Sequence, residues 1–129
     1  EISPSGSGVK MLAAGALKAA DELAEQGIDA EGIDLRTLRP LDMDTIIESV
    51  QKTNRVVACE EGWPTAGICA EIAAAINEQA FDYLDAPVVR VSGKDVPLPY
   101  AANLEALALP KPHDIVEAVQ QVTYRAEAA

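Results

Sequence analysis

The amino-acid sequence predicts an α/β protein built on an open, mainly parallel sheet with helices on both faces. Strand-like segments alternate with segments of helical periodicity along most of the chain, and this alternation is typical of parallel strands joined by crossover helices. The run Val56–Cys59 is continuously apolar, as strands covered on both faces are. The chain has 129 residues, of which 49% are apolar, and this is enough for the core of one domain.

The first two expected elements are a helix and a short strand. Alanines and leucines recur at intervals of three and four across residues 12–26, and Gly27 stands where a left-handed helix cap is expected. These residues predict an amphipathic helix. Apolar and polar side chains then alternate within residues 30–35, which predicts a strand.

A second helix and a buried strand are expected next. Asp42 or Asp44 can cap the start of the helix, and Asn54 is suited to its end. Isoleucine and valine side chains between these residues recur on one helical face. Residues 55–59 are then predicted to form a strand that is buried on both faces.

The last elements are a third helix, a strand and a final helix. Apolar residues at helical spacing across residues 68–76 predict the third helix, and residues 88–91 predict a strand that follows Pro87. Residues 92–112 are interrupted by prolines, and we expect them to be mostly irregular. Asp114 is then expected to open the final helix.

The expected domain spans residues 9–125, between a polar linker at residues 1–8 and a tail at residues 126–129. The 21 acidic and 10 basic residues give a formal charge of −11, which repels nucleic acid phosphates and anionic membrane surfaces. This charge favours a basic partner, although it can also simply keep the protein soluble. The sequence shows no apolar run near 18 residues and no signal or lipidation motif, so we expect a soluble intracellular protein without a membrane partner.

The sequence shows no pattern of residues that indicates catalysis or metal binding. His113 is the single histidine, and its place at an expected helix start favours capping or exposure over proton transfer. Cys59 and Cys69 each lie in an apolar pattern rather than a CxxC, which indicates small buried hydrophobes. The glycines of residues 6–8 suggest a nucleotide loop, but no strand precedes them. We therefore predict no catalytic, cofactor-binding or metal-binding residue here.

Residues 60–67, with the sequence EEGWPTAG, form the loop that leaves the buried strand. The carboxyl ends of strands in open α/β sheets are where ligands and partners bind. Glu60 and Glu61 are neighbours on an extended chain and so point to opposite sides, which favours loop bracing or interface ion pairs over joint catalysis. Trp63 beside Pro64 is either part of the core or an interface anchor.

Four motifs in order carry a resemblance to a known family. They resemble the C-terminal domain of the pyruvate dehydrogenase beta subunits, which is the transketolase C-terminal domain of the thiamine diphosphate enzymes, from about Ala16 to Arg125. The branched-chain 2-oxoacid dehydrogenase beta subunits share the first three motifs, and residues 100–105 (YAANLE) favour pyruvate. The motifs are residues 33–42 (IDLRTLRPLD), 60–64 (EEGWP), 84–87 (LDAP) and 96–105 (VPLPYAANLE).

The resemblance implies part of a pyruvate-decarboxylating enzyme that acetylates lipoyl groups. In this family, alpha and beta subunits form a heterotetramer that holds thiamine diphosphate with magnesium between them. The cofactor contacts lie in the alpha subunit and in a preceding domain of beta, so we expect this chain alone to bind no thiamine diphosphate and to be inactive. The bacterial cytoplasm or the mitochondrial matrix is the implied location.

The resemblance also implies two surfaces on this chain, one for docking and one for pairing. The position of Asp85 is an acidic docking contact for the subunit-binding domain of the dihydrolipoyl acetyltransferase, a small basic module. The C-terminal end of the chain, here Ala129, lies beside that contact in the family. The residues expected at the interface with the second beta subunit are Glu60, Glu61, Trp63 and Pro64.

The sequence departs from the family at its start, which leaves alternatives open. The family's domain begins with an apolar strand before the first helix, whereas residues 4–9 (PSGSGV) occupy that register. Such a sequence does not fill a buried central strand, and residues 9–13 are the only nearby substitute. The alternative functions are a branched-chain 2-oxoacid dehydrogenase beta subunit and a free-standing nucleotide- or anion-binding module that uses residues 6–8 and a helix N-terminus.

Overall fold

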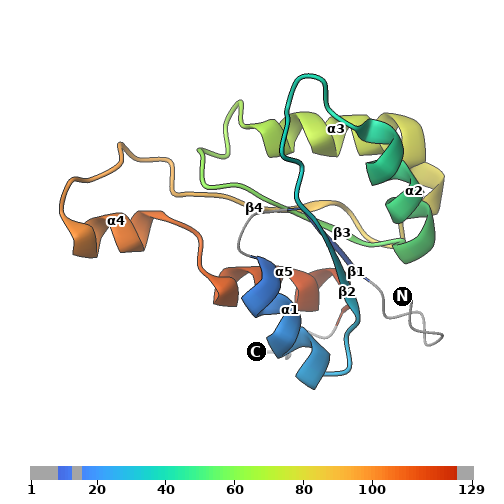
Figure 1. Cartoon of the computed structure of the whole chain (residues 1–129), viewed down its shortest axis with the longest axis horizontal. Coiled ribbons are helices and arrows are strands. Elements are labelled where there is room, and N and C mark those ends of the chain that lie inside the picture. The colour runs from blue at the N-terminus through green and yellow to red at the C-terminus, as the bar shows by residue number, and fades with distance from the viewer. Residues whose placement is uncertain (1–8, 13–15, 125–129) are drawn as a thin grey trace.

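The computed structural model describes residues 9–12 and 16–124, and these residues contain a four-stranded sheet (Figure 1). The strand order is β2-β1-β3-β4, and every neighbouring pair is parallel. The predicted open parallel α/β sheet is therefore confirmed. The strands are β1 (Val9–Leu12), β2 (Ala30–Ile33), β3 (Val56–Cys59) and β4 (Val89–Val91).

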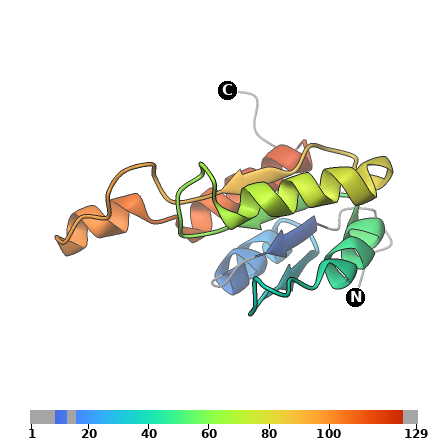
Figure 2. The same cartoon turned by 90° about the horizontal axis from the view of Figure 1, so that it is seen from above.

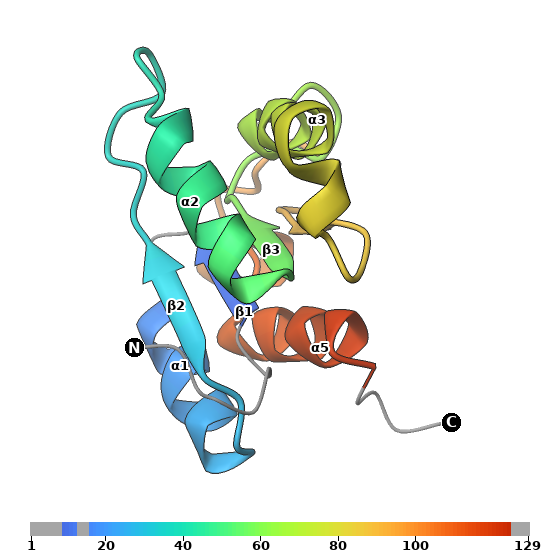
Figure 3. The same ribbon diagram turned by 90° about the vertical axis from the view of Figure 1, so that its right-hand side faces the viewer.

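Helices cover both faces of this sheet, as the sequence predicts. Helices α1 and α5 lie on one face, and α2 and α3 lie on the other (Figure 3). A short helix, α4, lies away from the sheet at the end of an extended loop (Figure 2). The helices are α1 (Ala16–Glu25), α2 (Met43–Thr53), α3 (Ile68–Ala80), the 3-10 helix η1 (Phe81–Tyr83), α4 (Ala102–Ala108) and α5 (Pro112–Val122).

Strand β3 joins the two halves of the core. Val57 and Cys59 belong to the buried cluster formed with α1 and α5, whereas Val56 and Ala58 belong to the cluster formed with α2 and α3. Successive side chains of a strand point to opposite faces, so an apolar run is needed where both faces are covered. The prediction of a doubly buried strand is confirmed.

The two cysteines are small buried hydrophobes, as predicted. Cys59 and Cys69 are free thiols with exposed fractions of 8% and 1%. Burial raises the pKa of each thiol to about 12, and smaller contributions come from the neighbouring thiol at Cys59 and from the Glu60 carboxylate at Cys69. Both thiols are therefore protonated at neutral pH, where a thiol is a poor nucleophile.

Strand β1 corrects the expected start of the first helix. The helical pattern places Leu12 in that helix, but Leu12 is the last residue of β1 and the helix is described from Ala16. Val9–Leu12 pairs with β2 on one side and with β3 on the other. Such hydrogen bonding to two neighbours is not visible in local periodicity, and it prevails over a helical pattern. The central strand that residues 4–9 put in question is therefore present at Val9–Leu12.

The boundaries of α2 follow from local capping chemistry. Asp42 is the N-cap, and its carboxylate accepts a hydrogen bond from the Thr45 amide at 3.1 Å. The hydrogen bonds from the Thr45 hydroxyl and amide lower the pKa of Asp42. Asn54 closes the helix in the left-handed conformation, with φ 62°. Of the two predicted caps, Asp42 is correct, and the predicted end at Asn54 is confirmed.

Two expectations for the C-terminal part are wrong. Residues 92–112 are not wholly irregular, because α4 forms at Ala102–Ala108. The final helix begins at Pro112 rather than at Asp114, because Asp114 occupies the third helical position and its carboxylate accepts from the Lys111 amide at 2.6 Å. A carboxylate in this position satisfies a backbone donor from within the first turn, so it marks the helix start from two residues further along.

The limits of the domain remain predictions. Residues 1–8 and 126–129, the expected linker and tail, lie outside the described residues, as does Arg125 at the expected domain end. None of the helices described is long and apolar enough to cross a bilayer.

Candidate functional site

The loop after β3 has one carboxylate turned inward and one exposed. The Glu60 amide donates to the Val91 carbonyl at 2.9 Å, which joins the loop to the end of β4. The Glu60 carboxylate lies against Gly67, and its Oε1 is buried without a hydrogen-bond partner. Glu61 is exposed. The two carboxylates therefore have different environments, as expected for neighbours on an extended chain, and they do not form a joint acid and base.

Trp63 and Pro64 brace this loop from two sides. The Trp63 indole Nε1 donates to the Val96 carbonyl at 3.0 Å, while the Pro64 carbonyl accepts from the Arg90 guanidinium at 2.8 Å. The Trp63 side chain is 55% exposed. Of the two roles considered for Trp63, membership of the core is therefore wrong. Its large exposed apolar surface agrees with an interface role.

An arm of apolar residues continues from the place where Trp63 is held. Residues 94–109, which include α4, project away from the sheet (Figures 1 and 2). The Lys94 amide donates to the Ala108 carbonyl at 2.9 Å and closes the base of the arm. A hollow of about 490 Å³ lies there, lined in part by Trp63 and Leu98. The exposed large apolar side chains of the arm are Val96, Leu98, Tyr100, Leu104 and Leu107.

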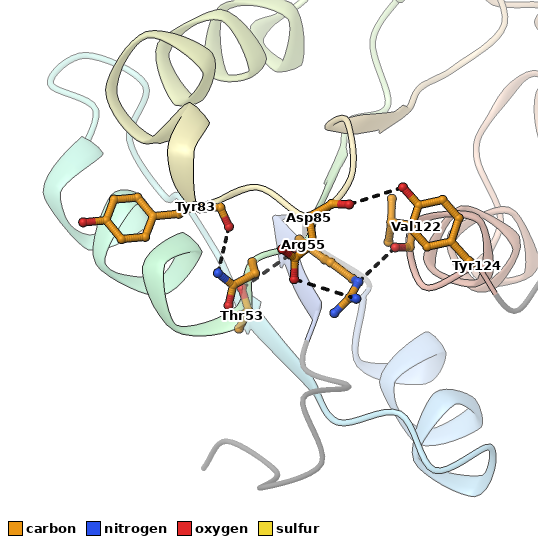
Figure 4. A network of polar contacts seen from close by, with 7 residues as sticks. Thr53, Arg55, Tyr83, Asp85, Val122 and Tyr124 are labelled. Atoms are coloured by element: carbon orange, nitrogen blue, oxygen red, sulfur yellow. Dashed lines mark hydrogen bonds and ion pairs between the residues drawn. The ribbon is translucent and has the colours of Figure 1, made fainter.

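A network of polar contacts holds Asp85 at the opposite end of β3 from this arm (Figure 4). The Asp85 amide donates to the Asn54 carbonyl at 2.8 Å, and the Asn54 side chain donates to the Tyr83 carbonyl at 2.8 Å. One Arg55 nitrogen lies 3.8 Å from the Asp85 carboxylate. The backbone of the Asp85 loop is thus tied to the end of α2, while its carboxylate stays 56% exposed.

The same network brings the end of α5 to Asp85. Arg55 Nε donates to the Val122 carbonyl at 3.1 Å, and the Tyr124 hydroxyl donates to the Asp85 carbonyl at 3.2 Å. Arg55 and Tyr124 are site residues that sequence reasoning missed, because nothing local in the chain shows that they meet. Ala129, the other expected docking residue, lies outside the described residues.

The remaining polar candidates do not gather into a centre. His113 is exposed on α5, and its Nε2 lies 3.0 Å from the Glu117 carboxylate one turn along the helix. The expectation that His113 faces solvent is confirmed. Within residues 9–12 and 16–124, no group of three or more His, Cys, Asp or Glu side chains is placed to hold a metal ion.

Comparison with known proteins identifies the relatives of this chain. The chain is 59% identical over 110 residues to the pyruvate dehydrogenase E1 component subunit beta of Rhizobium meliloti, covering 85% of this chain and 24% of that protein. It is 60% identical over 112 residues to the mitochondrial subunit beta-1 of Arabidopsis thaliana, covering 87% of this chain and 31% of that protein. The chain therefore spans a quarter to a third of the length of these relatives.

A solved structure and a family model agree with this result. A chain described as split gene transketolase, inactive beta4 tetramer, superposes with a TM-score of 0.71 and 31% sequence identity, covering 92% of this chain and 39% of that one. The model of the transketolase C-terminal domain matches residues 7–115. The resemblance carried by the four sequence motifs is confirmed, and the chain belongs to the transketolase C-terminal domain family.

Proposed function

We propose that this chain is the C-terminal assembly domain of a pyruvate dehydrogenase beta subunit, which pairs beta subunits and docks the subunit-binding domain of a dihydrolipoyl acetyltransferase. The observation that carries the proposal is an identity near 60% to named beta subunits over 84–87% of the chain. In the complete enzyme, thiamine diphosphate with magnesium is held by the alpha subunit and the preceding beta domain. The domain works in the cytoplasm of a bacterium or in the mitochondrial matrix.

The exposed arm supports the pairing role. Its apolar side chains and Trp63 lie on one projecting segment rather than scattered over the surface (Figure 1). Contiguous apolar surface of this kind is typical of interfaces between subunits. The solved relative is described as a tetramer, which is consistent with a domain that assembles. Exposed Glu61 and half-buried Glu60 and Pro64 stand beside Trp63, at the edge of the proposed interface.

Trp63→Ala is expected to weaken pairing by about 2 kcal/mol or more, close to a thirtyfold rise in the dissociation constant, because an aromatic anchor loses its contact area. Sedimentation equilibrium measures this constant. Trp63→Phe should keep most of the affinity, since it loses only the hydrogen bond to Val96. Phe81→Ala removes another exposed aromatic ring far along the chain and should have no effect. An unchanged dissociation constant with a lower melting temperature would assign Trp63 a role within the monomer.

The acidity around Asp85 supports the docking role. Between Arg55 and Arg90 the chain carries Glu60, Glu61, Glu71, Glu78, Asp82 and Asp85 and no lysine, arginine or histidine. Such a stretch attracts a basic module and repels an acidic one. The backbone contacts of Asp85 hold its carboxylate in place before a partner arrives, which lowers the entropy lost on binding.

Calorimetry on the purified chain tests the proposal as a whole. We expect the subunit-binding domain of a dihydrolipoyl acetyltransferase to bind, and we expect thiamine diphosphate with magnesium, ATP and NAD to give no heat of binding. We also expect no decarboxylation of pyruvate by this chain alone, because the proposal places the cofactor contacts elsewhere. Tight binding of any of the three small molecules, or turnover without an alpha subunit, would overturn the assignment.

The alternatives are tested by the same measurements. The relatives named above are pyruvate dehydrogenase subunits, which favours pyruvate over branched-chain 2-oxoacids. A branched-chain assignment would follow if the chain bound only the acyltransferase of that complex. The glycines of residues 6–8, on which a nucleotide- or anion-binding module depends, lie outside the described residues.

A further inference from the structure

A recess of about 420 Å³ lies directly beside Asp85. One side is formed by Ala73 and Asn77 of α3 and by Phe81 at the start of η1, and the other side by the segment 84–88. Ala73, Asn77 and Phe81 follow each other at intervals of four, so they form a single stripe that leads down the helix toward Asp85. The recess and the carboxylate are therefore parts of one surface.

The lining of the recess suits an apolar side chain. Asn77 and Asp85 are the polar side chains among the lining residues, and the others are alanine, valine, leucine, proline and phenylalanine. The Phe81 ring is 65% exposed at the edge. An inserted apolar side chain would remove part of this surface from water, which contributes about 25 cal/mol per Å² of apolar area buried.

The surroundings of the recess determine the charge of the partner. Glu78 and Asp82 are exposed on the same helical segment, and Asp85 is on the edge of the recess. The whole stretch of residues 56–89 contains no basic side chain. A partner that fills the recess therefore approaches through a negative field, and a cationic segment is favoured over a neutral or acidic one.

We infer that this recess receives a bulky apolar side chain from the same basic module whose cation meets Asp85, so that docking has two contacts rather than one. The inference rests on the proposed docking function and extends it. Because Arg55 already lies 3.8 Å from the Asp85 carboxylate, the partner's cation shares that carboxylate with a resident guanidinium. An apolar contact beside it adds affinity that does not depend on the shared charge.

Filling the recess tests the inference directly. Ala73→Met places a longer side chain in the recess, whereas Ala74→Met makes the same change at an exposed neighbour on α3 that does not line it. Against the subunit-binding domain of a dihydrolipoyl acetyltransferase, we expect Ala73→Met to raise the dissociation constant about tenfold and Ala74→Met to leave it within about twofold. Phe81→Ala, at an exposed position where folding is not at risk, should raise it about fivefold.

Salt separates the apolar contact from the ionic one. The effect of Asp85→Asn should shrink as ionic strength rises, whereas the effect of Ala73→Met should persist. If Asp85→Asn weakens binding while Ala73→Met and Phe81→Ala do not, the recess is not used and the docking function stands. If the wild-type chain does not bind the module, the docking function itself fails. A change in self-association with unchanged module binding would assign the recess to a second copy of the chain.

Discussion

Asp85→Ala is expected to weaken binding of the acetyltransferase's subunit-binding domain by about 2 to 5 kcal/mol, seen mainly as faster dissociation. The substitution leaves the partner's cation buried in the interface without its carboxylate, and an unpaired buried charge is costly. Arg55 keeps its hydrogen bond to Val122, so the fold around the site should survive. Surface plasmon resonance with the immobilised module gives both rate constants.

A matched control separates this contact from the net charge of the domain. Asp21→Ala makes the same chemical change on α1, where the side chain is exposed on the opposite face of the sheet from α3. Both variants lose one negative charge, so both should slow association slightly at low salt, and the difference should fade where the Debye length is about 8 Å. If Asp85→Ala leaves the off-rate within about twofold of the Asp21→Ala value, Asp85 is not a docking contact.

Gly93→Ala is expected to destabilise the folded chain by about 3 kcal/mol, because the added methyl group has no room. A Cβ at Gly93 would fall within contact distance of the Glu61 carbonyl, 3.1 Å from the Gly62 carbonyl and 3.3 Å from the Ala108 carbonyl. All three are backbone atoms, so the loop after β3 or the base of the arm would have to shift. The midpoint of urea denaturation measures the loss.

Two other glycines serve as controls for this substitution. Gly32→Ala adds the same methyl group on β2, where a Cβ would meet nothing within 4 Å, and it should be neutral or slightly stabilising. Gly27 also has open space but a φ of +75°, so Gly27→Ala should cost about 1 kcal/mol through the backbone alone. Equal losses at Gly32 and Gly93 would show that crowding at Gly93 is not the cause.

The elements that sequence reasoning predicted are those with local signals. Asp42 and Asn54 bound α2 through their own capping chemistry, and the apolar run of β3 reports burial on both faces. Helix α4 escaped because seven residues between prolines are too few to show a period, and no side chain caps its start. Strand β1 escaped because its two neighbours lie far along the chain.

The candidate site divides in the same way. The chemistry of Trp63 and Asp85 is visible in the sequence, and so is the resemblance that drew attention to them. The bond from Arg55 to Val122 joins residues 67 positions apart, and the Tyr124 contact with Asp85 spans 39. Contacts of that range leave no periodic trace. The same holds for Gly67 and Gly93, whose need for glycine arises only where distant backbone segments approach closely.

The strand order also bears on how the chain folds while it is being synthesised. Strand β1 leaves the ribosome first and can pair early with β2, through Val9 and Ala30. Its other edge pairs at Lys10 with Val56, which does not yet exist at that point. At roughly 5–20 residues per second, that edge stays open for several seconds. An unpaired strand edge invites pairing with other chains, so this interval is when we expect nascent chains to depend most on chaperones.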